Sequence, residues 1–118
     1  MEKPIKNIDT DKQEFIKSYA TTKTYLTTSL LLTKDTMFDI DGLISEIDGV
    51  TYGLSRLRSS EGDEKYIQEF SGYLDEIEGR IKPKLREMRS GLDDIYDDLS
   101  TILLRLEERF KERLSQIL

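Results

Sequence analysis

Apolar residues recur at steps of three and four along almost the whole chain, and this spacing places them on one face of an α-helix. The pattern fills two long stretches, and a short polar loop at 59–63 separates them. Long amphipathic helices joined by a short loop pack antiparallel to each other. We predict an all-α fold, either an antiparallel helical hairpin or a four-helix bundle with long, coiled-coil-like helices. Residues 1–9 are predicted to form a flexible N-terminal tail before a single helical domain at 10–118.

Three short segments are candidate breaks in these helices. Segment 33–36 has a threonine at each end, and the second one could cap a new helix. Segment 79–83 ends at Pro83, which has no N–H to donate and crowds the carbonyl group four residues earlier. Segment 89–91 contains a Ser-Gly pair. We leave open whether each half of the chain is one kinked helix or two helices.

Residues 40–58 repeat the unit Ile-Asp-Gly followed by an aliphatic residue, and three interpretations compete. The second Asp-Gly pair is a strong signal for a β-hairpin turn. Asp39, Asp41 and Gly42 resemble part of the calcium-binding loop of EF-hand proteins, although the first ligand position lacks an aspartate. The hairpin would have no third strand to pair with. We favour a helix, because apolar residues continue through the segment at helical spacing.

The composition excludes several kinds of chemistry. The chain contains no cysteine and no histidine, so it cannot form a disulfide, a thiolate metal site or a catalytic site built on histidine. Charged residues make up 36% of the chain, which suits the long solvent faces of helical bundles, and the net charge of −6 makes nucleic acid an unlikely partner. The apolar runs are far shorter than the roughly 20 residues that cross a membrane. We therefore expect no transmembrane segment and a cytoplasmic location.

Two pairs of acidic residues are candidate metal ligands. Asp75-x-x-Glu78 is followed by Asp94-x-x-Asp97, and magnesium prefers carboxylate oxygens. This arrangement resembles the acidic pairs on two helices of the all-α nucleotide pyrophosphohydrolases, although that family prefers glutamate at most of these positions. The resemblance implies a magnesium-dependent enzyme with these four residues as metal ligands. The other interpretation is that the acids of residues 93–98 lie on a solvated helix face and repel one another.

Basic residues gather in one block at 80–89, between two acidic blocks. This candidate basic patch consists of Arg80, Lys82, Lys84, Arg86 and Arg89. A weak nucleic-acid or phosphate binder is therefore a second alternative function, although aromatic residues are not interleaved with the basic ones. We favour pairing between this block and an acidic block of a neighbouring chain, because charges beside an apolar seam set partner and orientation.

The most economical hypothesis is a non-enzymatic helical interaction or assembly module. Two long helices with a continuous apolar stripe cannot bury that stripe alone, so we expect a homodimer or homotetramer, or a helical protein partner. We expect no cofactor in this case, and magnesium only for the enzyme alternative. The candidate interface residues share the helical stripe of the second half: Ile67, Phe70, Leu74, Ile77, Ile81, Met88, Ile95, Leu99, Ile102 and Leu106.

Overall fold

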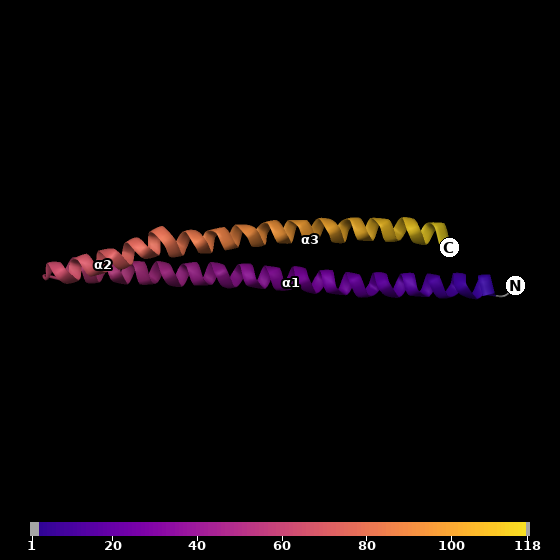
Figure 1. Cartoon of the computed structure of the whole chain (residues 1–118), viewed down its shortest axis with the longest axis horizontal. Helices are drawn as coiled ribbons and strands as arrows, with labels where there is room; N and C mark the ends of the chain where they lie inside the picture. The colour runs from indigo at the N-terminus through magenta and orange to yellow at the C-terminus, as the bar shows by residue number, and fades with distance from the viewer. Residues whose placement is uncertain (1–2, 118) are drawn as a thin grey trace. The chain divides into compact units, whose positions relative to one another are not determined.

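The computed structural model describes residues 3–117, and the side chains of residues 10–116. In this part of the chain every element is helical, which confirms the all-α prediction (Figure 1). The elements are α1 (Lys3–Ser60), α2 (Glu64–Glu76), the π-helical segment η1 (Ile77–Ile81) and α3 (Lys82–Ile117). The chain divides into two compact units: unit 1 takes in residues 3–33 and 95–117, and unit 2 takes in residues 34–94.

Unit 2 is a helical hairpin that closes at residues 61–63, inside the predicted loop (Figure 1). The carboxylate of Glu61 accepts hydrogen bonds from the backbone N–H groups of Gly62 and Asp63, both at 3.1 Å. Asp63 then caps α2, since its Oδ1 accepts from the N–H of Lys65 at 3.0 Å. Acidic side chains thus satisfy backbone donors within the turn and in the first turn of α2, where a helix N-terminus leaves N–H groups without partners.

The core of unit 2 is a narrow seam between α1 and the helical run from α2 to α3. Ile40 on α1 and Leu74, Ile77 and Leu85 on the opposite side are its buried apolar residues. Half-buried residues complete the seam at helical spacing, among them Ile44, Ile47 and Leu54. None of the side chains of residues 10–116 is fully buried, because two helices alone leave one side of every residue near solvent.

The π-helical segment η1 shifts the seam by one residue. Up to Ile77 the seam follows steps of three and four, but the next seam residue is Lys82 and not Ile81. The N–H of Lys82 donates to the carbonyl group of Ile77, five residues earlier. Pro83 explains why the wider turn occurs here, since it cannot donate to the carbonyl group of Gly79. The predicted break at 79–83 is therefore an inserted residue within a continuous helical run.

At the other two candidate breaks the helix is continuous. α1 continues through 33–36, where the Thr33 hydroxyl donates to the carbonyl group of Ser29 at 2.7 Å within the same helix. α3 continues through 89–91. α1 also runs through 40–58 with no positive φ angle, which confirms the helical interpretation and excludes both the β-turn and the calcium loop.

α1 begins at Lys3, inside the segment predicted as a tail. Residues 3–9 therefore belong to this helix, and residues 1–2 lie outside the described residues.

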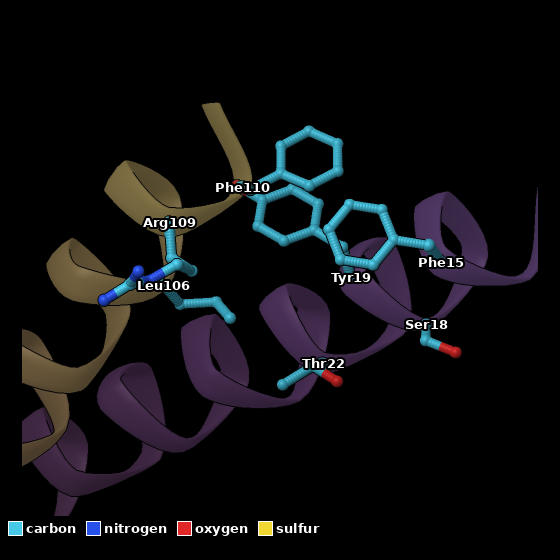
Figure 2. A pocket seen from close by; sticks show the side chains of 7 residues that line it. All are labelled: Phe15, Ser18, Tyr19, Thr22, Leu106, Arg109 and Phe110. Atoms are coloured by element: carbon cyan, nitrogen blue, oxygen red, sulfur yellow. The ribbon is translucent and has the colours of Figure 1, made fainter. Parts of the chain in front are cut away.

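Unit 1 is held together by aromatic residues from α1 and α3. The ring of Tyr19 stacks on that of Phe110 with centroids 3.6 Å apart, and the ring of Phe15 lies 5.5 Å from Phe110 (Figure 2). Lys23 forms an ion pair with Glu107 at 3.2 Å. Offset and stacked aromatic pairs stabilise beyond their buried area, so this cluster joins the two helical segments of unit 1.

Candidate interaction surface

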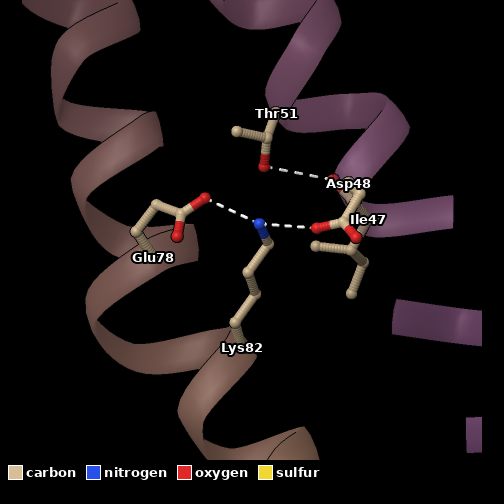
Figure 3. Close-up of polar contacts among 5 residues, drawn as sticks. All are labelled: Ile47, Asp48, Thr51, Glu78 and Lys82. Carbon is tan, nitrogen blue, oxygen red and sulfur yellow. Dashed lines mark hydrogen bonds and ion pairs between the residues drawn. The ribbon is translucent and has the colours of Figure 1, made fainter. Parts of the chain in front are cut away.

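One side of the seam in unit 2 carries a lysine held between two carboxylates. The Nζ atom of Lys82 lies 2.6 Å from Oδ1 of Asp48 on α1 and 2.7 Å from Oε1 of Glu78 on η1 (Figure 3). The Lys82 side chain is only 8% exposed, whereas the two acids are 57% and 50% exposed. The aliphatic stem of Lys82 therefore fills the seam while its charge reaches the edge. The hydrogen bonds to Asp48 and then to Glu78 raise the pKa of Lys82 and outweigh the opposite effect of burial.

Arg89 repeats this arrangement seven residues later. Its Nε lies 2.9 Å from Oδ1 of Asp41, and its Nη1 lies 2.6 Å from Oδ1 of Asp93. Asp41 precedes Asp48 by the same seven residues on α1. Because α1 and α3 run in opposite directions, Asp41 lies level with Arg89 when Asp48 lies level with Lys82. We call this side of the seam the ion-paired flank; its members are Lys82, Arg89, Asp41, Asp48, Glu78 and Asp93.

The opposite side of the seam is apolar and open. Asp41 and Asp48 each follow a seam residue of α1, whereas Leu43 and Val50 each precede one, so the two sets lie on opposite sides of the helix. We call this second side the apolar flank. Its members lie on both arms of the hairpin and are between 40% and 57% exposed: Leu43, Val50 and Leu57 on α1, Tyr73 on α2, Ile81 on η1 and Met88 on α3.

The two arms contribute to the apolar flank at matching levels. The ion pairs place Asp48 level with Lys82, so the neighbouring residues Val50 and Ile81 also lie at one level. A shallow hollow joins the arms on this side, lined by Leu54, Tyr73, Glu76, Ile77 and Ile81. Seam residues and flank residues thus form one continuous apolar surface.

Of the ten candidate interface residues predicted from the sequence, six are buried or half-buried and four are exposed. Leu74 and Ile77 are buried in the seam of unit 2. Half-buried positions are occupied by Ile67, Phe70, Leu99 and Leu106. The remaining four are exposed and spaced by seven residues: Ile81, Met88, Ile95 and Ile102. The predicted stripe therefore combined buried or half-buried residues with residues of a separate exposed row.

Sequence reasoning missed Lys82 and Arg89 as seam residues. Both belong to the candidate basic patch, yet each places its side chain between the helices and pairs with acids of its own unit. Arg80 also forms an ion pair, with Glu76 at 3.5 Å, while Lys84 and Arg86 are exposed. The signal that could have revealed the seam is the matched spacing of two acids on α1 and two bases on α3.

The four candidate metal ligands are all exposed on their helices. Asp75 lies on α2, Asp94 and Asp97 lie on α3, and Glu78 of η1 is engaged by Lys82. In the part of the chain whose side chains are described, no three acidic residues come together in a group that could hold a metal ion.

The hollow beside the aromatic cluster of unit 1 is shallow. It is lined by Phe15, Ser18, Tyr19, Thr22, Leu106, Arg109 and Phe110 (Figure 2). The rings that line it stack on one another, so the cluster serves packing within unit 1.

Comparison with protein-family models, with curated proteins and with solved structures finds no match to this chain. None of the helices within residues 3–117 has an apolar stretch long enough to cross a membrane.

Proposed function

We propose that this chain is a non-enzymatic helical assembly module that associates with itself through the apolar flank of unit 2. One observation carries the proposal: the flank places apolar side chains from both arms of the hairpin on one exposed side, at repeated spacings of seven residues along α1. Contiguous exposed apolar surface of this kind marks interaction sites, whereas single exposed apolar residues do not.

The width of the apolar stripe favours a bundle of more than two helices. Two apolar positions in every seven residues suffice for a two-helix seam, whereas bundle helices use a third position beside them. In unit 2 the third position is filled by the apolar flank. We therefore propose a coiled-coil-like four-helix bundle formed by two hairpins.

The two alternative functions have weaker support. A magnesium-dependent pyrophosphohydrolase would need Glu78 to bind metal, but Glu78 pairs with Lys82. A phosphate site at 80–89 would need Lys82 and Arg89, which pair with acids of their own unit. Both sites would have to break ion pairs before they could bind a ligand.

Light scattering over a dilution series tests self-association. The expected molar mass rises from 13.8 kDa toward at least twice that value as concentration increases. Met88→Glu is expected to shift this rise to higher concentration, because a carboxylate on the flank would be desolvated in the complex.

Phe38→Glu is the matched control for Met88→Glu. Phe38 is exposed in unit 2 but lies outside the apolar flank, so this variant is expected to associate like the parent. A constant mass of 13.8 kDa at every concentration would refute the proposal.

A further inference from the structure

We infer that a second copy of this chain covers the apolar flank with both hairpin turns at the same end, so that α1 of each copy packs beside η1 and α3 of the other. The inference rests on the proposed self-association and specifies its partner and orientation. It follows from the charges that border the flank in unit 2.

The border of the flank on α1 is acidic. Glu46 lies three residues after Leu43 and four before Val50, which places it beside both on the helix surface. Asp39 precedes Glu46 by seven residues on the same side of α1. Both are exposed. We call Asp39 and Glu46 the acidic edge.

Between Ile81 and Met88 the border on the opposite arm is basic. Lys84 lies three residues after Ile81 and four before Met88, so it borders the flank as Glu46 does on α1. Arg80 directly precedes Ile81; it pairs with Glu76 at 3.5 Å, and its side chain is still 72% exposed. We call Arg80 and Lys84 the basic edge.

The two edges lie at matching levels of the hairpin. The register set by Asp48 with Lys82 and by Asp41 with Arg89 brings Glu46 level with Lys84, on opposite borders of the flank. Among the ion pairs of residues 10–116, neither Glu46 nor Lys84 takes part in any. Their charges are therefore available to a partner.

A two-fold axis can bring two copies of the flank together in two ways. With the turns at the same end, the axis runs along the helices, and each acidic edge meets the basic edge of the other copy. Glu46 then faces Lys84 of the second copy at both borders. With the turns at opposite ends, α1 faces α1 and α3 faces α3, so the acidic and basic edges no longer meet. When the axis crosses the middle of the flank, at the level of Val50, the two Arg80 side chains approach each other.

Charge complementarity selects the first arrangement. Like charges placed across an interface disfavour an orientation, and opposite charges fix register more than they add affinity. The self-complementary pairing of acidic and basic edges is also what a two-fold interface requires, since the same contact must occur twice. A second copy is thus the partner whose charges match this flank.

Disulfide trapping distinguishes the two arrangements, because the chain has no cysteine of its own. Glu46→Cys and Lys84→Cys are prepared as separate proteins, mixed and oxidised. The expected product is a disulfide-linked dimer that contains one of each, whereas either protein oxidised alone is expected to give little disulfide-linked dimer. Arg80→Cys alone is expected to give little cross-linked dimer.

Three outcomes of these experiments test the proposed orientation and the self-association on which it rests. Efficient cross-linking of Arg80→Cys alone, or equal cross-linking in every combination, overturns the orientation while leaving self-association in place. A chain that stays monomeric by light scattering overturns both proposals. Predominance of mixed dimers supports the inference.

Charge reversal gives an independent measurement that needs no oxidation. Glu46→Lys and Lys84→Glu are each expected to weaken dimerisation by about two- to tenfold at low salt, since an exposed ion pair contributes little and the two-fold dimer contains the pair twice. The double variant, which restores opposite charges, is expected to regain the parent's dimerisation. No recovery in the double variant would contradict the pairing of these edges.

Discussion

The two flanks of unit 2 border the same seam but differ in whether their side chains find partners within the unit. On the ion-paired flank, Lys82 and Arg89 find carboxylates within their own unit. On the apolar flank, Val50 and Met88 are about half exposed and have no comparable cover. A charged group on a helix can be satisfied by its neighbours and by water, whereas exposed apolar area is removed from water only by packing against another surface.

The ion-paired flank also defines the register of the hairpin. A regular apolar repeat allows one helix to slide along another by seven residues. Sliding α1 by one repeat would bring Asp48 to Arg89 but would leave Lys82 without Asp48. Two pairs at matched levels therefore favour a single alignment, and that alignment places the residues of the apolar flank opposite one another.

The largest difference in the effect of an alanine substitution on stability is expected between Leu85 in the seam and Met88 on the flank, which lie three residues apart on α3. Leu85 is 9% exposed, and Leu85→Ala is expected to lower the free energy of unfolding by about 2–5 kcal/mol. Met88 is 57% exposed, and in dilute solution Met88→Ala is expected to change it by less than about 0.5 kcal/mol. Denaturant unfolding measures both, and equal losses in dilute protein would show that seam and flank are not distinct.

Replacement of two glycines on the outer face of α1, the solvent-facing side away from the seam and both flanks, is expected to stabilise the protein. Gly42 and Gly49 are exposed, and a Cβ atom at either position would meet nothing within 4 Å. Gly42→Ala and Gly49→Ala are each expected to stabilise the protein by about 0.5–1 kcal/mol, because glycine is a poor helix former. Thermal unfolding tests this, and a loss of stability in either variant would mean that the outer face is also an interface.

The ion-paired flank is expected to weaken at alkaline pH. The pKa of Lys82 is raised above its ordinary value of 10.5, so its pairing stabilises the fold fully below pH 10.5. That stabilisation is lost as the pH rises through the raised pKa of the folded state.

Lys82→Met is the matched variant for this pH dependence. It keeps an unbranched apolar stem in the seam but cannot titrate, so its unfolding free energy is expected to fall less steeply than the parent's above pH 10.5. Parallel curves for the two proteins over this range would contradict the role assigned to Lys82.

The smallest effect on stability is expected from replacing acidic residues that belong to neither flank. Asp94→Asn combined with Asp97→Asn is expected to leave stability unchanged or a few tenths of a kcal/mol higher at low salt, because like charges on one helix repel. Millimolar magnesium is expected to leave the melting temperature of both proteins unchanged. A magnesium-dependent rise in the parent that the double variant loses would instead support the enzyme alternative, since a ligand stabilises the state that binds it.

Periodicity predicted the helices and the turn, because these depend on local spacing and on polar residues at 59–63. It did not predict which apolar residues form the seam. From Ile77 a regular step leads to Ile81, whereas η1 adds one residue and brings Lys82 inward. Pro83 was a visible sign of irregularity, but it did not reveal whether the helix would kink, end or take an extra residue.

Lys82, a residue of the candidate basic patch, is buried in the seam. A lysine can bury its long stem and still keep its charge at the edge, so the side chain counts as apolar for packing and as charged for pairing. A sequence pattern that divides residues into apolar and polar assigns Lys82 to the surface. The structure shows that the partners at Asp48 and Glu78 allow it to lie in the seam.

The most direct test of the apolar flank as a self-association surface is the oxidation of methionine at increasing protein concentration. Met88 lies on the flank, whereas Met37 is half-buried on α1 and provides an internal reference. Peptide mass mapping after brief peroxide treatment measures both rates. We expect Met88 to oxidise rapidly in dilute protein and to become protected over the concentration range in which the molar mass rises, while the rate at Met37 changes little. A rate at Met88 that does not change with concentration, in protein that does associate, would contradict the account.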